Sequence, residues 1–343
     1  MKFELKYQNA ISGSQYEFEY SYVTKAVKLG PCQKCGALTK WFDVLFNVSV
    51  CSEECNSILW QKYKNDQQTQ GTYQNFEDHF KNVKAELVLG QANQEEWKDI
   101  IIVVKDQLDY FKQCIESVFE NTKNFHLYIW DNGSAEDTQK YIDDLVGSYD
   151  SKTDTHYKIT TIRSENNTGF IYPNNELAAL GTSPYIVLLN SDTKVFKLWD
   201  STMISFLKNN KDFAQVGYWG GHLDNTGRGF GGSNGHDIDY VPGWCFCISR
   251  DTYKEFGLFS DELKFAYFED SDYSLRLKEA GKKIYALYAP LVHHYQNKTV
   301  KTVEKEGTVN LRESFEHNHN YVQIRWKDYL ENNRVMAKKN KEV

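Results

Sequence analysis

The hydrophobic pattern of the chain changes near residue 96, and the longer part after that point is regular. Short apolar runs alternate there with segments whose apolar residues recur at helical spacing. Runs rich in β-branched residues predict buried strands, and the helical spacing predicts amphipathic helices. The predicted strands are 100–104, 125–130, 157–162 and 185–189, and the predicted helices are 108–118, 135–145 and 174–180. This alternation predicts an α/β domain, with a mostly parallel sheet flanked by helices.

Residues 1–95 follow a different pattern. Two short strands are predicted near 3–6 and 16–23, and helices at 52–64 and 75–89. Four cysteines form two closely spaced pairs with fifteen residues between the pairs: Cys32, Cys35, Cys51 and Cys55. Such pairs are typical of a structural Zn²⁺ site with four thiolates, with redox-active cysteines as the alternative. The sequence therefore predicts a small zinc-binding domain at 1–95, an α/β domain at 96–335 and a basic tail at 336–343.

Composition narrows the class of protein. The chain has 343 residues, of which 41% are hydrophobic and 25% charged, as in globular proteins. Its net charge of -7 argues against a protein that coats nucleic acid, since that function needs a dense basic surface. No apolar run is long enough for a membrane span, and the start lacks a secretory signal, so we expect a cytoplasmic protein. Three further cysteines are expected to be free thiols: Cys114, Cys245 and Cys247.

Polar clusters follow three of the predicted strands directly, and a fourth cluster begins a later helix. They are Asp131-Asn132-Gly133-Ser134, Asn167-Thr168-Gly169-Phe170, Asn190-Ser191-Asp192 and Glu269-Asp270-Ser271-Asp272. Each cluster alone is equally compatible with a turn or a helix start. In an α/β sheet, however, ligands bind at the carboxyl ends of the strands. The common position of the clusters therefore predicts a binding site.

Asp192 is the candidate metal ligand of this site. A diphosphate leaving group carries several negative charges and needs a cation that bridges its oxygens. Mg²⁺ or Mn²⁺ suits this task, because such ions keep bound water and take only one or two protein carboxylates. The sequence has no Gly-x-x-x-x-Gly-Lys-Ser/Thr loop, so a metal is the better candidate for holding phosphates.

From about Asp99 to Tyr295 the chain resembles a family 2 glycosyltransferase of the GT-A fold. The resemblance is carried in order by the four clusters and by Asn175, Gly243 with Arg250, Phe256-Gly257-Leu258-Phe259, Arg276 and the pair His293-His294. The second cysteine pair opens a predicted helix, which resembles treble-clef zinc fingers. The resemblance implies transfer of a sugar from a nucleotide-sugar donor, with UDP favoured, to a glycan or another hydroxyl acceptor. It also implies inversion at the sugar and a catalytic Mg²⁺ or Mn²⁺.

The resemblance also implies a role for each matching residue. Asp270 would be the general base and Glu269 would hold the acceptor or position Asp270. Asp192 would bind the metal together with His293 or His294, and the sequence leaves the choice between the histidines open. The donor would contact Asp131, Asn132, Ser134, Asn167, Gly169, Asn175 and Asn190.

Two segments depart from the simplest expectation. Lys105-Asp106 stands where the family often has a Thr-Tyr-Asn type of segment near the nucleobase, which weakens the case for uracil. The segment Gly220–Gly235 holds seven glycines in sixteen residues, which indicates a loop that closes over the site or an ordinary surface loop.

Other functions remain open at this point. A nucleotidyltransferase would ordinarily have a glycine-rich loop after the first strand, and Lys105-Asp106-Gln107-Leu108 has no glycine. A zinc-finger interaction protein with a degenerate α/β domain is a further alternative. A nucleic-acid acceptor is possible but not favoured, because only the cysteine pattern motivates it.

Overall fold

The computed structural model describes residues 5–8, 15–18, 23–31, 38–43, 48–49, 82, 85–86, 90, 95–150, 156–295 and 310–339. Contacts divide the chain into two units. One unit contains residues 1–85 and 288–293, and the other contains residues 86–287 and 294–343.

The first unit contains short antiparallel strands. β1 (Leu5–Gln8) pairs with β2 (Gln15–Phe18), which confirms a hairpin close to the predicted position. β3 (Val23–Pro31), β4 (Leu38–Asp43) and β5 (Val48–Ser49) form a second antiparallel sheet. Cys32, Cys35, Cys51 and Cys55, like the predicted helix 52–64, lie outside the described residues. The Zn²⁺ site therefore stays a prediction.

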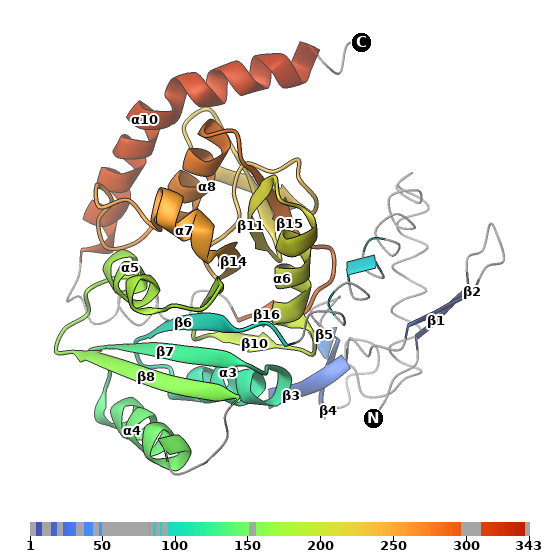
Figure 1. Ribbon diagram of the computed structural model, residues 1–343, viewed down its shortest axis with the longest axis vertical. Coiled ribbons are helices and arrows are strands. Elements are labelled where there is room, and N and C mark those ends of the chain that lie inside the picture. The colour runs from blue at the N-terminus through green and yellow to red at the C-terminus, as the bar shows by residue number, and fades with distance from the viewer. Residues whose placement is uncertain are drawn as a thin grey trace. The chain divides into compact units, whose positions relative to one another are not determined.

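The second unit is built on a seven-stranded sheet with the order β15-β11-β14-β9-β6-β7-β8 (Figure 1). Strands β6 to β9 are mutually parallel, and β14 is antiparallel to both of its neighbours, β9 and β11. The mostly parallel sheet predicted from the sequence is thus confirmed. The strands are β6 (Lys98–Val104), β7 (Phe125–Asn132), β8 (Tyr157–Ser164), β9 (Tyr185–Leu189), β11 (Phe213–Gly217), β14 (Cys245–Ser249) and β15 (Lys283–Ala286).

Helices cover both faces of this sheet. Figure 1 shows α3 and α4 on one side of β6–β8 and α5 on the other. Side chains alternate along β6, so that Ile101 packs in one buried cluster with Leu177 and Leu277, while Ile100 and Ile102 point to the opposite face. The helices are α3 (Leu108–Asn121), α4 (Glu136–Asp150), α5 (Ile171–Leu180), α6 (Trp199–Asn209), α7 (Arg250–Phe256), α8 (Glu269–Glu279) and α10 (Leu311–Lys339).

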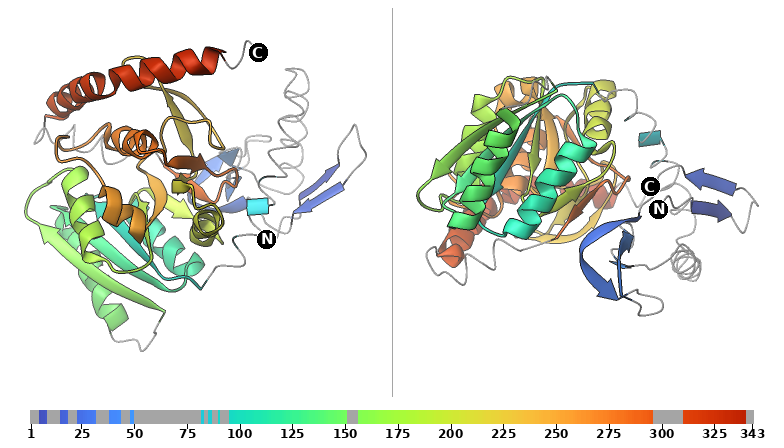
Figure 2. Two further views of the ribbon diagram at one scale, coloured as in Figure 1. Left: turned by 45° about the horizontal axis from the view of Figure 1, so that its top comes forward. Right: turned by 90° about the horizontal axis from the view of Figure 1, so that it is seen from below.

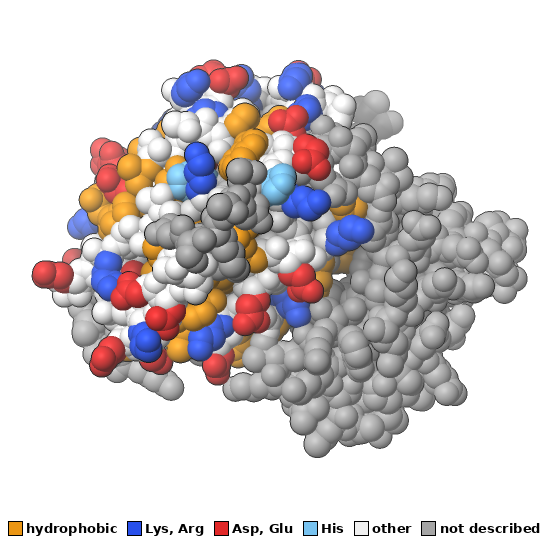
Figure 3. All heavy atoms as spheres, turned by 60° about the horizontal axis from the view of Figure 1, so that its bottom comes forward, with side chains coloured by type: hydrophobic (Ala, Val, Ile, Leu, Met, Phe, Trp, Pro, Cys, Tyr) orange, Lys and Arg blue, Asp and Glu red, His pale blue; other side chains and the backbone are white. Residues whose placement is uncertain are grey.

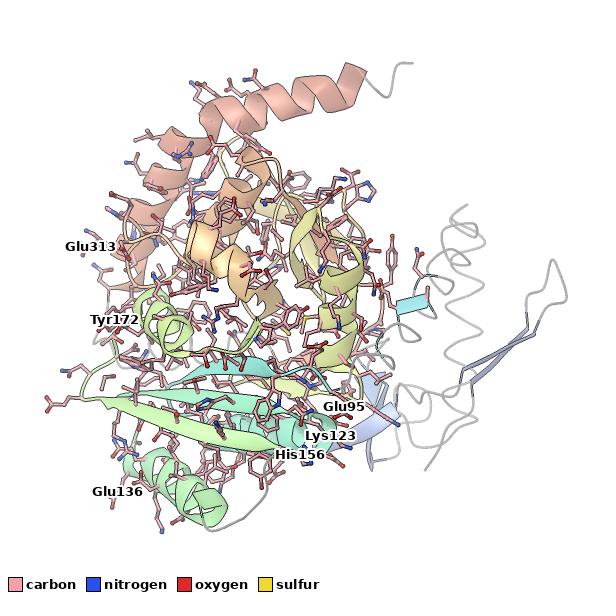
Figure 4. The ribbon with its side chains drawn as sticks, viewed as in Figure 1. Glu95, Lys123, Glu136, His156, Tyr172 and Glu313 are labelled. Atoms are coloured by element: carbon pink, nitrogen blue, oxygen red, sulfur yellow. The ribbon has the colours of Figure 1, made fainter. Side chains whose placement is uncertain are left out.

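The two edges of the parallel strands are marked by the side chains labelled in Figure 4. Glu95, Lys123 and His156 lie at the edge where strands begin, and Glu136 and Tyr172 lie at the edge where α4 and α5 start. Within the described residues, no helix has both the length and the apolarity that a membrane crossing requires.

Buried ion pairs tie the sheet to its surroundings. The Lys98 ammonium lies 2.7 Å from Asp200, and the Arg250 guanidinium lies 2.5 Å from Asp99. Arg250 also donates to the carbonyl of Ala178 at 2.7 Å. Removing one partner of such a pair would leave an uncompensated buried charge, so Arg250 serves the scaffold.

The glycine-rich segment is a β-hairpin. β12 (Gly220–Leu223) pairs antiparallel with β13 (Gly229–Ser233). A Cβ added to Gly221 would lie 2.2 Å from the Tyr240 ring, and one added to Gly232 would lie 2.5 Å from the Trp219 indole. The segment predicted to be a loop is therefore a strand pair, and its glycines permit close packing against aromatic rings.

Candidate active site

A cavity of about 340 Å³ lies where the parallel strands end, and it is large enough for a small-molecule ligand. Because β14 runs antiparallel, the residues before it also reach this edge, and the Asn190 N–H donates to the Trp244 carbonyl at 2.9 Å. The cavity brings together eight of the residues predicted from sequence: Asn132, Asn167, Gly169, Asn190, Asp192, Glu269, Asp270 and His294.

Asp192 and His294 form the pair at the end of β9. The buried Asp192 carboxylate lies 3.1 Å from Nε2 of His294, the last residue of β16 (Val292–His294). The backbone fixes this approach, since the Tyr295 N–H donates to the Asp192 carbonyl at 2.9 Å. The Trp244 indole stacks on the His294 ring, with 5.2 Å between the ring centroids. Of the two candidate histidines, His294 contacts Asp192 and lines the cavity, whereas His293 is half-buried and is not part of the cavity lining.

The chemistry of these groups fits a divalent cation. Asp192 offers a carboxylate and His294 an imidazole nitrogen. In addition, the side-chain oxygen of Asn190 is buried in the same region without a hydrogen-bond partner. Over the described part of the chain, no cluster of three or more His, Cys, Asp or Glu side chains forms a complete metal cage. Mg²⁺ and related ions do not require one, because water and substrate phosphates supply the remaining ligands.

Asn132 organises the loop that follows β8. Its amide nitrogen donates to the Asn167 side-chain oxygen and to the Gly169 carbonyl, both at 2.8 Å, and its oxygen accepts from the Thr168 N–H at 2.8 Å. Gly169 has φ +89°, and an added Cβ would lie 2.6 Å from the Phe265 carbonyl oxygen. The Asn-Thr-Gly sequence is therefore needed for backbone geometry at this point.

Three predicted donor contacts, Asp131, Ser134 and Asn175, are not among the residues that line the cavity. One Asp131 oxygen accepts from the Ser134 N–H at 2.9 Å, and the other lies 2.7 Å from Nε of Arg163. Both ends of the Asn175 amide bond to the backbone of Phe259, at 2.9 and 3.0 Å. The hydrogen bonds of Asp131, Ser134 and Asn175 thus hold the turn after β7 and the start of α5 in place.

Glu269 and Asp270 open helix α8 and face the cavity. The Asp270 carboxylate accepts from the Gly243 N–H at 3.0 Å and from the Ser271 N–H at 2.7 Å. Burial raises the pKa of Asp270, and these hydrogen bonds act in the opposite direction. Burial, followed by the charge of Asp270, raises the pKa of Glu269 to about 8. One Glu269 oxygen is buried without a hydrogen-bond partner. Burial thus disfavours the charged form of both carboxyl groups in this pair.

The segment before this pair has an unusual backbone. Phe265, Tyr267 and Phe268 line the cavity with φ of 54°, 81° and 67°. Residues other than glycine rarely adopt this left-handed backbone conformation, and those that do cluster at functional sites. The N–H groups of Phe170 and Ile171 both donate to the Phe265 carbonyl, at 2.6 and 3.2 Å. Sequence reasoning missed this segment, because no glycine or asparagine marks it.

Lys105 and Trp244 are cavity residues that the sequence reasoning did not assign. The Lys105 ammonium lies 2.7 Å from Asp106 and donates to the Gly133 carbonyl at 3.0 Å. Its position directly after the first strand was the available signal. No sequence signal marked Trp244, because its position at the cavity depends on the antiparallel direction of β14.

A mostly parallel α/β sheet with acidic side chains at its carboxyl edge agrees with the family matches of the sequence. Residues 99–242 match Glycosyl transferase family 2, and residues 225–312 match Glycosyltransferase like family 2. These matches support a family 2 glycosyltransferase over this part of the chain. A comparison with curated proteins finds no match.

Many solved structures resemble this chain, including two that contain Mn²⁺. The crystal structure of GalNAc-T7 with UDP, GalNAc and Mn²⁺ has a TM-score of 0.50 at 15% identity, and the match covers 58% of this chain and 44% of that one. The chain therefore spans less than half of that protein. Mannosyltransferase PcManGT from Pyrobaculum calidifontis, in complex with GDP-Man and Mn²⁺, has a TM-score of 0.45 at 10% identity, covering 61% of this chain and 63% of that one. The first likeness shows a GT-A-like fold.

Proposed function

We propose that the protein transfers a sugar from a nucleoside-diphosphate donor to an acceptor hydroxyl, with inversion and with a divalent cation. The observation that carries the proposal is that Asp192, His294 and Asp270 line one cavity at the carboxyl edge of the sheet. A group that holds phosphates and a group that accepts a proton are then both within reach of one bound substrate pair.

The donor would bind at the end of the cavity formed by β7 and β9. Asp192 and His294 would hold Mg²⁺ or Mn²⁺, and the ion would offset the charge that develops on the leaving diphosphate. Asn190 would contact the ribose or water on the ion, and Asn132 would keep the adjoining loop in shape. The GalNAc-T7 structure contains UDP and Mn²⁺, which favours a UDP-sugar and manganese as the first ligands to test.

The acceptor would bind against Glu269 and Asp270. In its ionised form, Asp270 would take the proton of the acceptor hydroxyl while the hydroxyl oxygen bonds to the anomeric carbon. The bond from that carbon to the diphosphate breaks in the same displacement, which inverts the configuration. Protonated Glu269 can donate a hydrogen bond to the acceptor. Catalysis then depends on placement and charge rather than on a covalent intermediate.

Replacement of the proposed base tests this assignment. In Asp270→Asn the transfer rate should fall by roughly 10²–10⁴-fold, the usual contribution of general base catalysis, while donor affinity stays within twofold. Release of nucleoside diphosphate measures transfer, and thermal shift with UDP and Mn²⁺ measures binding. Asp261→Asn, which changes an exposed carboxylate on the preceding loop, is the matched control. Full activity in Asp270→Asn would exclude this residue as the base.

The same assay separates the alternatives. A nucleotidyltransferase would release pyrophosphate instead of nucleoside diphosphate. A nucleic-acid acceptor would require a basic surface. On the face shown in Figure 3, the described Lys and Arg side chains are interspersed with Asp and Glu, which does not favour this alternative. Zinc analysis of the purified protein, with Cys32→Ser as the comparison, tests the predicted four-cysteine site separately.

A further inference from the structure

Asn318 of helix α10 forms hydrogen bonds with backbone groups that lie outside that helix. Its side chain is fully buried. The amide nitrogen, with its two N–H donors, lies within hydrogen-bond distance of three carbonyl oxygens, those of Lys264, Ala266 and Tyr267, at 2.8, 2.9 and 2.9 Å. Its oxygen accepts from the Lys264 N–H at 2.8 Å. One side chain therefore contacts four backbone groups of a segment that lies outside any helix or strand.

This segment is the one with left-handed residues at the cavity. Phe265, Tyr267 and Phe268 have positive φ and no regular hydrogen-bond ladder, so contacts from elsewhere must hold their conformation. Two contacts do so from different parts of the chain. The N–H of Phe170 bonds to the Phe265 carbonyl from the loop after β8, and Asn318 bonds to the flanking carbonyls from α10.

Glu269 and Asp270 follow the segment directly, as the first two residues of α8. Their direction is set by the backbone turn at Tyr267 and Phe268. We propose that Asn318 is a positioning residue for the acceptor end of the cavity: it holds residues 264–268 so that both carboxyl groups face the acceptor. This inference rests on the proposed function.

Helix α10 is well placed to act as a rigid support for Asn318. Figures 1 and 2 show α10 lying across α8. Val322 and Trp326 of α10 pack in a buried cluster with Leu275 of α8, and the Trp326 indole donates to Asp272 at 2.9 Å. The segment and the carboxylate helix are thus both fixed to the same element, which makes their relative placement sensitive to Asn318.

The donor end is held by contacts other than those of Asn318. Asn132 and Asp192 lie at or just beyond the ends of β7 and β9, whereas the backbone groups that Asn318 contacts lie within 264–267. Loss of the Asn318 amide should therefore loosen the acceptor end and leave nucleotide binding intact. A residue with only a general structural role would change both ends together.

The test compares Asn318→Ala with Asn320→Ala, which removes an exposed amide from the same helix. Amide hydrogen exchange of the full chain reads the segment without any substrate. In Asn318→Ala we expect at least tenfold faster exchange in peptides that cover 264–272, and unchanged exchange around Asp192. The apparent affinity for UDP with Mn²⁺ should stay within twofold, while UDP release from UDP-N-acetylgalactosamine or UDP-glucose should fall at least tenfold through kcat. Asn320→Ala should match the wild type throughout.

Asn318→Ser, which keeps one donor group in a smaller volume, should give intermediate values and serves if the alanine variant does not fold. Unchanged exchange in 264–272, or faster exchange with unchanged UDP release, overturns the inference. If the wild-type protein neither binds UDP-sugars nor releases UDP, it is the proposed function that fails. The exchange result would then still report whether Asn318 holds the segment.

Discussion

The donor and acceptor ends of the cavity are built in different ways. At the donor end, Asn132 and Asp192 stand at or just beyond the ends of strands whose hydrogen-bond ladders fix the backbone. At the acceptor end, Glu269 and Asp270 follow a segment with left-handed residues. That segment is contacted by Asn318, which lies 54 residues after Lys264.

This difference separates two sources of precision in one site. The sheet positions the donor residues at the strand ends through many equivalent hydrogen bonds, and the Asn132 side chain holds the loop of Asn167 and Gly169 beside them. The acceptor residues depend on a few specific contacts. Changes at the donor end should therefore act mainly through lost ligands, and changes at the acceptor end mainly through altered geometry.

The largest effect is expected at Asp192. Asp192→Ala removes the carboxylate of the proposed metal site, and transfer should fall by about 10³-fold or more, since the cation stabilises the departing diphosphate. Binding of UDP should lose its dependence on Mn²⁺ in a thermal-shift titration. Asp212→Asn, which changes an exposed carboxylate elsewhere in the domain, should leave both measurements unchanged.

The histidine beside Asp192 sharpens this test. His294→Ala should weaken the apparent affinity for Mn²⁺ by roughly 10–100-fold, as loss of groups around a metal does. His293→Ala is the matched neighbour and should have little effect. Equal effects of the two variants would contradict the assignment of His294.

A smaller effect is expected where the two ends meet, at Gly169. Gly169→Ala places a Cβ 2.6 Å from the Phe265 carbonyl oxygen in a backbone with φ +89°. The free energy of unfolding should fall by about 2–4 kcal/mol, as overpacking and positive φ combine. Gly257→Ala is the matched control, because Gly257 has φ +68° but nothing within 4 Å of the added atom. Urea unfolding of both variants separates the clash from the backbone strain.

The smallest effect concerns the pH dependence of stability. The pKa of Glu269 is raised from the ordinary 4.5 to about 8, so the folded protein binds a proton there that the unfolded chain has lost. Between these values, stability contributed by this group falls as pH rises. Glu269→Gln should flatten the decline of the unfolding free energy between pH 5 and pH 8 measured in urea. The exposed Glu262→Gln should keep the wild-type slope.

The donor end was the more predictable of the two. Strand β9 was predicted residue for residue, since buried parallel strands carry continuous apolar runs, as Tyr185–Leu189 does. Strand β7 extends through Asp131 and Asn132, which hydrophobic patterning could not show because both residues are polar. Asp131 was expected to face the donor, yet it pairs with Arg163 from the neighbouring strand.

The acceptor end was predictable in identity but not in shape. Motif resemblance indicated Glu269 and Asp270, and the structure places both at the cavity. The left-handed backbone before them has no local signature, because the groups that contact it, at Phe170 and Asn318, are distant in the sequence. The contact of His294 with Asp192 likewise depends on how the chain returns to Asp192, and patterns within one segment do not contain that information.

The position of β9 has a consequence for the order of folding. This strand joins the parallel group β6–β8 to β14, β11 and β15. Pairings between distant segments form late, because loop closure costs entropy before the contacts repay it. Asp192 follows β9 and meets His294 only 102 residues later. Asp192 and His294, the two proposed metal ligands, come together when the second half of the sheet is complete. A bound cation would therefore slow unfolding and leave the rate of folding nearly unchanged.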